Sequence, residues 1–269
     1  MGQHRLHPSS RLSEAEWLAA RRAPFGSHSV ASVVPGGFPA YLRILHPAQG
    51  RNRERLRWAE VASKSDRTMH RLVQFHAINR TPVSGSEAAT PPESGNLPSA
   101  LLTVACAVLA EHTATPEHCW FCLWNGYGWL HPTTSSPLVW KPAGAFEGPD
   151  APLHNTPDAT PQSLVLPAIV HNGPCVEFPQ REYLLFEGPL EAAAEIGWNM
   201  RGGHFIPQSP NLFWPDDHAW CVASEIDLFC TLVAGSDALA ESLLADPRLE
   251  AWRVFPDDSV TADSDDKNT

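Results

Sequence analysis

The sequence predicts an α+β fold, in which a mainly antiparallel sheet packs against a central buried helix and carries long Pro-rich loops. Two observations lead to this prediction. Short apolar runs of strand length alternate with turn residues along most of the chain, and one longer segment has the composition of a buried helix.

The segment Ser99–His112 is the clearest helix. Pro98 suits its start, because the missing N–H of proline would have no partner in the first turn of a helix. Apolar residues occur nearly all round this segment, so we expect it to be central and buried. They include Leu101, Leu102, Val104, Ala105, Val108 and Leu109.

Two strand–turn–strand units are expected in the first half of the chain. In the second of them, Asn125-Gly126 supplies the positive φ angles of a tight hairpin. The paired runs are Val30–Val34 with Phe38–Leu45, and Cys119–Trp124 with Trp129-Leu130.

A strand meander followed by a helix is expected near the C-terminus. Ser236 has the side chain of a helix cap, and Gly235 before it breaks the preceding strand. The expected strands are Leu212–Trp214, Ala219–Ser224, Phe229–Val233 and Glu250–Val254, and the expected helix is about Asp237–Ala245.

We expect a single α+β domain over residues 14–256. It would follow a flexible N-terminus at 1–13 and precede an acidic disordered tail at 257–269, with irregular loops at 81–96 and 131–162. The first helix, about Glu14–Arg22, would begin at a capping box formed by Ser13 and Glu16.

Charge is divided unevenly along the chain. Residues 1–80 hold 13 Arg and Lys against 5 Asp and Glu, whereas residues 81–269 hold 6 against 25. Mutual neutralisation within the fold is favoured over nucleic-acid binding through Arg43–Arg80, because few stacking aromatics accompany the basic residues.

Nothing in the sequence indicates a membrane or an oxidising compartment. The longest apolar run, Ala100–Ala110, is too short to cross a bilayer, and the N-terminus lacks the apolar stretch of a signal peptide. Six cysteines in 269 residues do not indicate a disulfide scaffold. We therefore expect a cytoplasmic protein with reduced thiols and no membrane contact.

One group of residues invites comparison with a metal site: His112, His118, Cys119 and Cys122. Zinc requires four such ligands around one centre. In a strand, however, residues three apart point to opposite faces, so Cys119 and Cys122 would not share a metal. We expect a structural role for these cysteines, no metal and no cofactor.

The carboxylates near the C-terminus allow two interpretations. Asp216 and Asp217 follow Pro215, where aspartate is favoured in a turn, although a pair of carboxylates also suits acid–base chemistry. Glu225 and Asp227 would share one face of a strand. They are either solvated at an edge or buried, and burial would require a cation, for which Arg181 is the best candidate.

Aromatic residues gather at two expected turns. Trp124, Tyr127 and Trp129 surround one, and Trp214 and Trp220 flank the other. Clustered aromatics either cap a core or form a binding surface. We predict a binding surface made of these five residues with Asp216 and Asp217, and we add Arg181 as a candidate.

Four segments resemble a family of uncharacterised actinobacterial proteins: FPAYLRILHPA, HCWFCLWNGYGW, YLLFEGPL and SPNLFWPDDHAWCVASEIDLFCTLVAGS. The family has no assigned activity, so the resemblance implies no reaction. The sheet-plus-helix ending also resembles immunity-type interaction domains, a likeness of fold that does not identify a function.

The chain contains none of the sequence motifs that identify a nucleotide-binding loop or a nucleophile elbow. The prediction is therefore a non-enzymatic cytoplasmic protein-interaction protein, immunity-like or regulatory. Its partner is an unknown protein, and the sequence identifies no small-molecule ligand. The alternatives are a hydrolase that uses a metal or carboxylates, and a nucleic-acid-binding protein that uses its basic N-terminal part.

Overall fold

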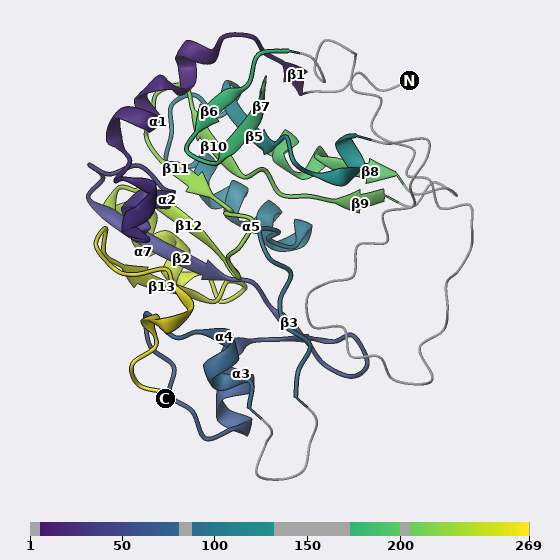
Figure 1. Cartoon of the computed structure of the whole chain (residues 1–269), viewed down its shortest axis with the longest axis vertical. Coiled ribbons are helices and arrows are strands. Elements are labelled where there is room, and N and C mark those ends of the chain that lie inside the picture. The colour runs from purple at the N-terminus through teal and green to yellow at the C-terminus, as the bar shows by residue number, and fades with distance from the viewer. Residues whose placement is uncertain (1–5, 81–87, 132–172, 200–204, 269) are drawn as a thin grey trace.

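The computed structural model describes residues 6–80, 88–131, 173–199 and 205–268. Helices cover both faces of one large antiparallel sheet (Figure 1), which confirms the predicted α+β fold. The expected loop residues 81–87 and 132–162 lie outside the described part, so the irregular excursion predicted there is not tested.

The main sheet has nine strands within the described residues. They are β1 (His7–Pro8), β2 (Ala40–Leu45), β5 (Cys119–Trp124), β6 (Val176–Phe178), β7 (Arg181–Gly188), β10 (Leu212–Pro215), β11 (Cys221–Ala223), β12 (Cys230–Gly235) and β13 (Ala251–Val254). Their order is β1-β7-β5-β10-β11-β12-β2-β13, and β6 pairs with β7 as well. Two small ribbons add β3 (Ala48–Gln49) with β4 (Arg55–Leu56), and β8 (Gly197–Asn199) with β9 (Phe205–Pro207).

Helices and 3₁₀ turns connect and cover these strands. The α-helices are α1 (Glu16–Arg21), α2 (Val30–Val33), α3 (Trp58–Lys64), α4 (Phe75–Ile78), α5 (Ser99–Ala110) and α7 (Asp237–Ala245). The 3₁₀ turns are η1 (Leu12–Ala15), η2 (Phe25–Ser27), η3 (Gly128–Leu130), η4 (Leu190–Glu195) and η5 (Ala262–Ser264).

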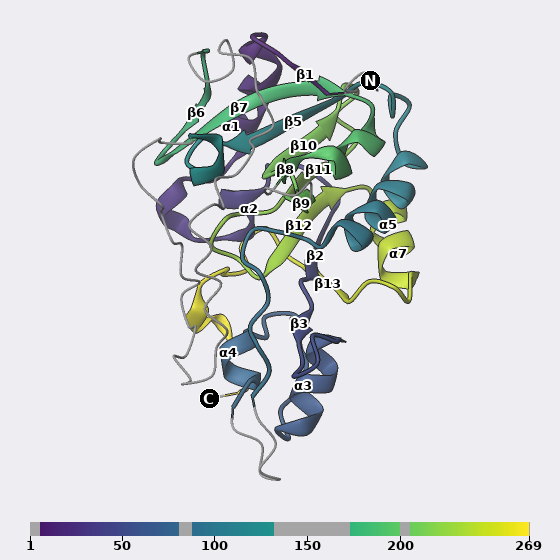
Figure 2. The same cartoon turned by 90° about the vertical axis from the view of Figure 1, so that its right-hand side faces the viewer.

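Side chains alternate between the two faces of the sheet, as the two-residue period of a strand requires. On β5, Cys119, Phe121 and Leu123 face one hydrophobic cluster, and Trp120 and Cys122 face the other. Figure 2 shows α5 and α7 on one side of the sheet and α1 and α2 on the other. Both faces are therefore dry, which explains why the central strands are apolar without interruption.

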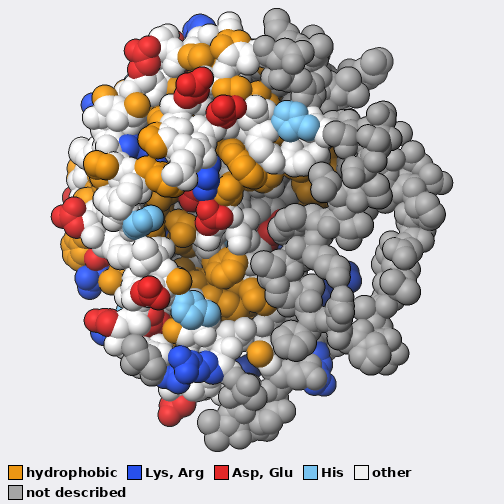
Figure 3. Space-filling model, viewed as in Figure 1, with side chains coloured by type: hydrophobic (Ala, Val, Ile, Leu, Met, Phe, Trp, Pro, Cys, Tyr) orange, Lys and Arg blue, Asp and Glu red, His pale blue; other side chains and the backbone are white. Residues whose placement is uncertain are grey.

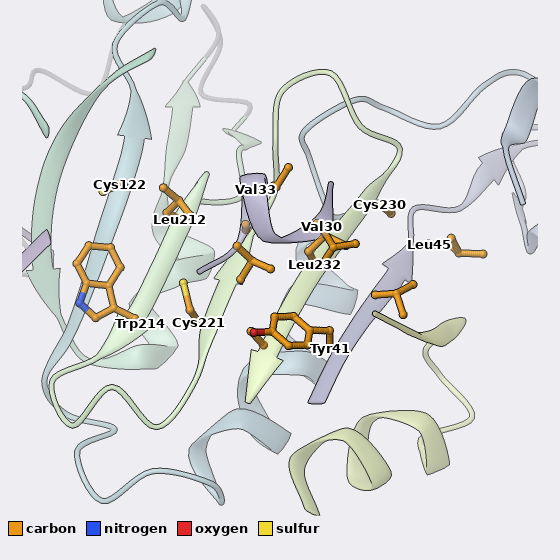
Figure 4. Close-up of a cluster of buried hydrophobic side chains, with 14 of the residues drawn as sticks. Val30, Val33, Tyr41, Leu45, Cys122, Leu212, Trp214, Cys221, Cys230 and Leu232 are labelled. Atoms are coloured by element: carbon orange, nitrogen blue, oxygen red, sulfur yellow. The ribbon is translucent and has the colours of Figure 1, made fainter. Parts of the chain in front are cut away.

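We name these clusters after one helix in each. The α5 core includes Leu42, Ile44, Leu102, Leu109, Phe121, Phe213, Trp220, Val233 and Leu243. The α1 core, part of which is drawn in Figure 4, includes Leu18, Val30, Tyr41, Leu45, Trp58, Phe75, Cys122, Trp214 and Leu232.

The predicted central helix is present as α5, which begins after Pro98 and ends at Ala110. Its Leu102, Ala105 and Leu109 are buried in the α5 core. The expected cap of α7 is also present, because the Leu239 N–H donates to the Ser236 hydroxyl at 3.1 Å. None of the helices within the described ranges is long and apolar enough to cross a membrane.

Two local predictions in the N-terminal part are wrong. Val30–Val33 forms a helical turn buried in the α1 core, whereas its β-branched residues had suggested a strand. Both edges of β2 are already occupied by β12 and β13, so a strand at 30–34 would have no partner there. The capping box is absent as well, because the chain enters α1 through the 3₁₀ turn Leu12–Ala15, which encloses Ser13.

Both predicted disordered ends are anchored where the structure describes them. His7 and Pro8 pair with β7 opposite Glu187 and Phe186. At the other end, the buried Asp265 accepts a hydrogen bond from the His70 imidazole at 2.7 Å. The predicted disorder of the tail rests on acidic composition alone, and composition does not indicate these hydrogen-bond partners.

The Asn268 side chain completes the anchor of the C-terminal segment. Its amide donates to the Thr68 carbonyl at 2.9 Å and to Asp265 at 3.0 Å. Burial raises the pKa of Asp265, but hydrogen bonds from Asn268, the Gln74 N–H and His70 outweigh burial and hold that pKa at about 2.

We expect Asp265→Asn to reduce the dependence of stability on acid. A carboxylate whose folded pKa lies below its unfolded value stabilises the fold above the unfolded pKa, and this contribution disappears as the pH falls through the folded pKa. Between about pH 5 and about pH 2, the free energy of unfolding measured in urea should fall by about 2 kcal/mol more for the wild type than for the variant. The exposed Asp263→Asn variant is the control, and equal losses in Asp265→Asn and the wild type would contradict the assignment.

Candidate functional site

A groove of about 360 Å³ opens where β5 ends and the β6–β7 hairpin turns. We call it the Trp124 groove. It is lined by Trp124, Asn125, Gly126, Glu177, Phe178, Gln180, Arg181 and Glu182. Two of the predicted site residues, Trp124 and Arg181, therefore belong to one concave surface.

The turn after β5 shapes the floor of this groove. The Asn125 N–H donates to the Glu182 carbonyl at 2.8 Å, so the chain stays beside β7 as it leaves the strand. A Cβ atom built on Gly126 would lie 2.2 Å from the Trp124 ring, so only glycine lets the indole fold over the turn.

The predicted hairpin at Asn125-Gly126 is wrong. Neither residue has a positive φ, and Trp129-Leu130 lies in a 3₁₀ turn instead of a strand. The reason is that β7 and β10 occupy both edges of β5, which leaves no position for a strand that follows it directly.

Arg181 joins three segments at one wall of the groove. Its guanidinium donates to Glu225 at 2.9 Å and to Asp227 at 2.8 Å, and it lies 6.0 Å from the centre of the Trp124 ring. Burial alone would lower the pKa of Arg181, but Glu225 and Asp227 raise it overall.

The expected pairing of Arg181 with these two carboxylates is thus observed, although its setting differs from the prediction. Glu225 and Asp227 lie in the connection between β11 and β12 and not on one face of a strand. The Glu225 side chain is 14% exposed and that of Asp227 is 75% exposed, so only Glu225 needs the cation in order to be buried.

The lining of the groove also includes two glutamates that the sequence analysis missed. Glu177 and Glu182 are directly opposite each other in the β6–β7 pair, and both are exposed. Like charges in this position repel each other. Among the described residues no cation lies within salt-bridge distance of either.

The signal for this hairpin was present in the sequence. Pro179-Gln180 forms its turn, with Gln180 in the left-handed region at φ 63°. Proline at the second position and a positive φ at the third are typical of a type II turn. The flanking strands β6 and β7 place Glu177 and Glu182 on adjacent positions of the same sheet.

One further residue of the groove has a hydrogen-bond acceptor that lacks a donor. The side-chain oxygen of Asn125 is buried and has no hydrogen-bond partner within the described ranges. A buried carbonyl oxygen of this kind costs free energy until it receives a donor. The groove therefore presents the negative charge of Glu177 and Glu182, whereas the Asn125 oxygen is buried.

An aromatic column supports the groove from inside the protein. Trp124 meets Tyr127 edge to face at 5.2 Å, Tyr127 stacks on Trp129 at 5.9 Å, and Trp129 stacks on Trp198 at 5.2 Å. The Asn211 amide donates to the Tyr127 hydroxyl at 3.0 Å. The three aromatic residues predicted around this turn thus lie together, and Trp198 joins them.

The other two tryptophans predicted for the binding surface are buried inside the protein. Trp214 and Trp220 are both 0% exposed, in the α1 core and the α5 core respectively. The Trp220 indole donates to the Leu109 carbonyl at 3.0 Å, which ties β11 to α5. Their place beside a turn had suggested exposure, but the sheet is covered on both faces.

Asp216 and Asp217 lie at the far end of the sheet. Their turn adjoins Cys119, whereas the groove adjoins Trp124, and the six residues of β5 separate these ends by roughly 17 Å at the usual rise per residue. The predicted single patch of five aromatics and two aspartates is therefore wrong.

The turn interpretation of these aspartates agrees with their contacts. The Asp217 carboxylate accepts hydrogen bonds from the Thr113 hydroxyl and the Ala114 N–H, both at 2.8 Å. Partial burial raises the pKa of Asp217, but these bonds lower it overall. Asp216 accepts from the Trp120 indole at 3.1 Å.

Cys119 and Cys122 are held apart, as the strand period predicts. Cys119 lies in the α5 core and Cys122 in the α1 core, on opposite faces of the sheet. Burial raises the pKa of the Cys119 thiol to about 12. Within the described residues, no three His, Cys, Asp or Glu side chains gather in a way that could hold a metal ion.

Several arginines of the basic N-terminal part bind within the fold. Arg11 pairs with Glu187 and Arg71 pairs with Asp258, while Arg57 donates to the carbonyls of Pro247 and Leu249. On the face shown in Figure 3, positive and negative side chains are interspersed. These contacts favour neutralisation within the fold over nucleic-acid binding.

Comparisons of the chain with protein-family models, curated proteins and solved structures gave no significant match. The resemblance to actinobacterial proteins stays a prediction, and the argument about function depends on the groove itself.

We expect a double-mutant cycle to show that Arg181 and Glu225 act as a pair. Arg181→Gln leaves the mostly buried Glu225 without its cation, so urea unfolding of the single and double variants should give a coupling energy of about 1–2 kcal/mol. The exposed pair Arg253–Asp237 is the control and should couple by less than about 1 kcal/mol. Equal coupling in both pairs would exclude a role for burial.

Proposed function

We propose that this chain is a non-enzymatic protein-interaction protein whose Trp124 groove receives a lysine or arginine side chain of a protein partner. The observation that carries this proposal is the acidic pair Glu177 and Glu182, which belongs to the lining of the Trp124 groove and has no cation within salt-bridge distance among the described residues. A partner's cation would relieve their repulsion.

The charge around the groove supports a basic partner. Glu225 and Asp227 share the cation of Arg181, and Arg22 lies over the Phe178 ring at 4.7 Å. With Glu177 and Glu182, the four carboxylates outnumber these two cations by two. A surface with this balance attracts a basic segment over a distance of about 10 Å at moderate salt.

The lining supports a side chain with both an apolar stem and donors at its tip. Trp124 offers apolar surface to the methylene groups and to the charge, whereas one face of the Phe178 ring is already covered by Arg22. The carboxylates of Glu177 and Glu182 offer acceptors to the N–H groups. Lysine and arginine combine these properties.

The volume supports a side chain or a short peptide segment more than a whole cofactor. About 360 Å³ is near the lower limit of small-molecule sites, which run from about 300 to 1,000 Å³. The lining contains no Ser, Cys or His, so a hydrolase at this site would depend on the carboxylates of Glu177 and Glu182.

The test is peptide selection on the intact protein. A random-peptide display library panned on the immobilised full chain should enrich peptides that carry Lys or Arg next to an apolar residue. Calorimetry with one such peptide should then compare the wild type with two variants. The double variant Glu177→Gln, Glu182→Gln and the single variant Trp124→Ala should each bind about tenfold or more weakly, a loss of about 1.4 kcal/mol of binding free energy.

Glu241→Gln is the matched control, because Glu241 is an exposed acid on α7, which packs beside β13 at the opposite edge of the sheet. This variant should bind the peptide as the wild type does. Enriched peptides without a cation, or equal binding by the groove variants, would refute the proposal. Cleavage of the peptide, detected by mass spectrometry, would favour the hydrolase alternative instead.

A further inference from the structure

A second polar feature lies under the opposite half of the sheet, where Arg43 points from β2 into the α1 core. The residue is only 6% exposed. One guanidinium nitrogen donates to the Val73 carbonyl at 2.7 Å, and the group lies 5.9 Å from the centre of the Trp58 ring. The Nε–H is buried and has no hydrogen-bond partner in the described part of the chain.

A largely enclosed cavity of about 30 Å³ adjoins this guanidinium. Its walls include Val30 and Leu232, which are next to each other in Figure 4, and Val260 from the C-terminal segment. A water molecule needs roughly 10–15 Å³ measured in this way, so the cavity has room for about two waters or one monatomic ion.

The charge of Arg43 is not compensated by the protein within the described residues, because no carboxylate lies within 4.0 Å of it. The acids in its neighbourhood are already engaged. Asp265 binds His70, Asp258 binds Arg71, and Glu250 accepts hydrogen bonds from the backbone N–H groups of Trp58 and Ala59. Backbone carbonyls and a ring face offset part of the cost of a buried cation, and an unpaired buried charge remains expensive.

We propose that this cavity binds one small monovalent anion of halide size against the guanidinium of Arg43. An anion there would give the Nε–H an acceptor and neutralise the charge, whereas water would supply only the acceptor. The volume excludes sulfate and phosphate. The C-terminal residues Ser259 and Val260 line the cavity, so the bound ion would stabilise the packing of that segment on the sheet.

The experiment measures unfolding of the full chain in urea while sodium bromide replaces sodium gluconate at constant ionic strength. A ligand that binds only the folded state multiplies the folding equilibrium constant by one plus its concentration over Kd, which is about elevenfold at ten times Kd. The wild type should show this gain over the Arg43→Met variant, which reports the general effect of bromide.

Arg43→Met should fold, because replacing a buried charged group with an apolar side chain of similar length is often neutral or stabilising. Arg253→Met on the neighbouring β13 is the matched control and should keep the bromide response of the wild type, since Arg253 does not line the cavity. Equal bromide responses in the wild type and Arg43→Met would overturn the proposal.

Crystals of the wild type soaked in bromide give an independent measurement that does not depend on any variant. An anomalous peak beside the Arg43 guanidinium is the expected result. Density for two waters at that place without an anomalous signal would overturn the proposal.

Discussion

The rest of the structure depends on β5 being covered on both faces and paired along both edges. Phe121 of β5 stacks on Phe213 of β10 at 6.0 Å in the α5 core, and Trp120 and Cys122 fill the α1 core on the other side. Burying an unpaired polar side chain on such a strand is costly, and β5 carries only apolar residues and cysteines. Polar and charged groups are therefore displaced to the ends of the strand, where the Trp124 groove and the Asp217 turn are found.

Much of the architecture follows from local sequence because the strongest patterns were also the longest. The α5 segment is apolar on nearly every side and begins after Pro98, so its burial and its start were predictable. The run Cys119–Trp124 was predicted at its observed bounds, and Ser236 does cap α7. At these places local propensity and tertiary packing favour the same structure.

The sequence-based predictions fail where strand pairing in the sheet, and not local sequence, determines the conformation of a segment. Val30–Val33 and Trp129-Leu130 have strand composition, yet every edge near them is occupied by strands that are distant in sequence. The predicted exposure of the tryptophans fails for a related reason. Trp214 is fully buried because the sheet is covered on both faces there, whereas Trp124 at the end of β5 is only partly buried. Of the site, sequence provided Trp124 and Arg181 but not Glu177 and Glu182, whose proximity arises from strand register.

The strand order also has a consequence for how the chain is made. Ile44 of β2 pairs with Thr231 of β12 on one side and with Ala251 of β13 on the other. A ribosome delivers β2 long before either neighbour exists, and pairings of such long sequence separation form slowly. The apolar faces of β2 and the Val30–Val33 turn therefore stay without their partners until the last strand is released, and this interval is when the nascent chain is most exposed to misassociation.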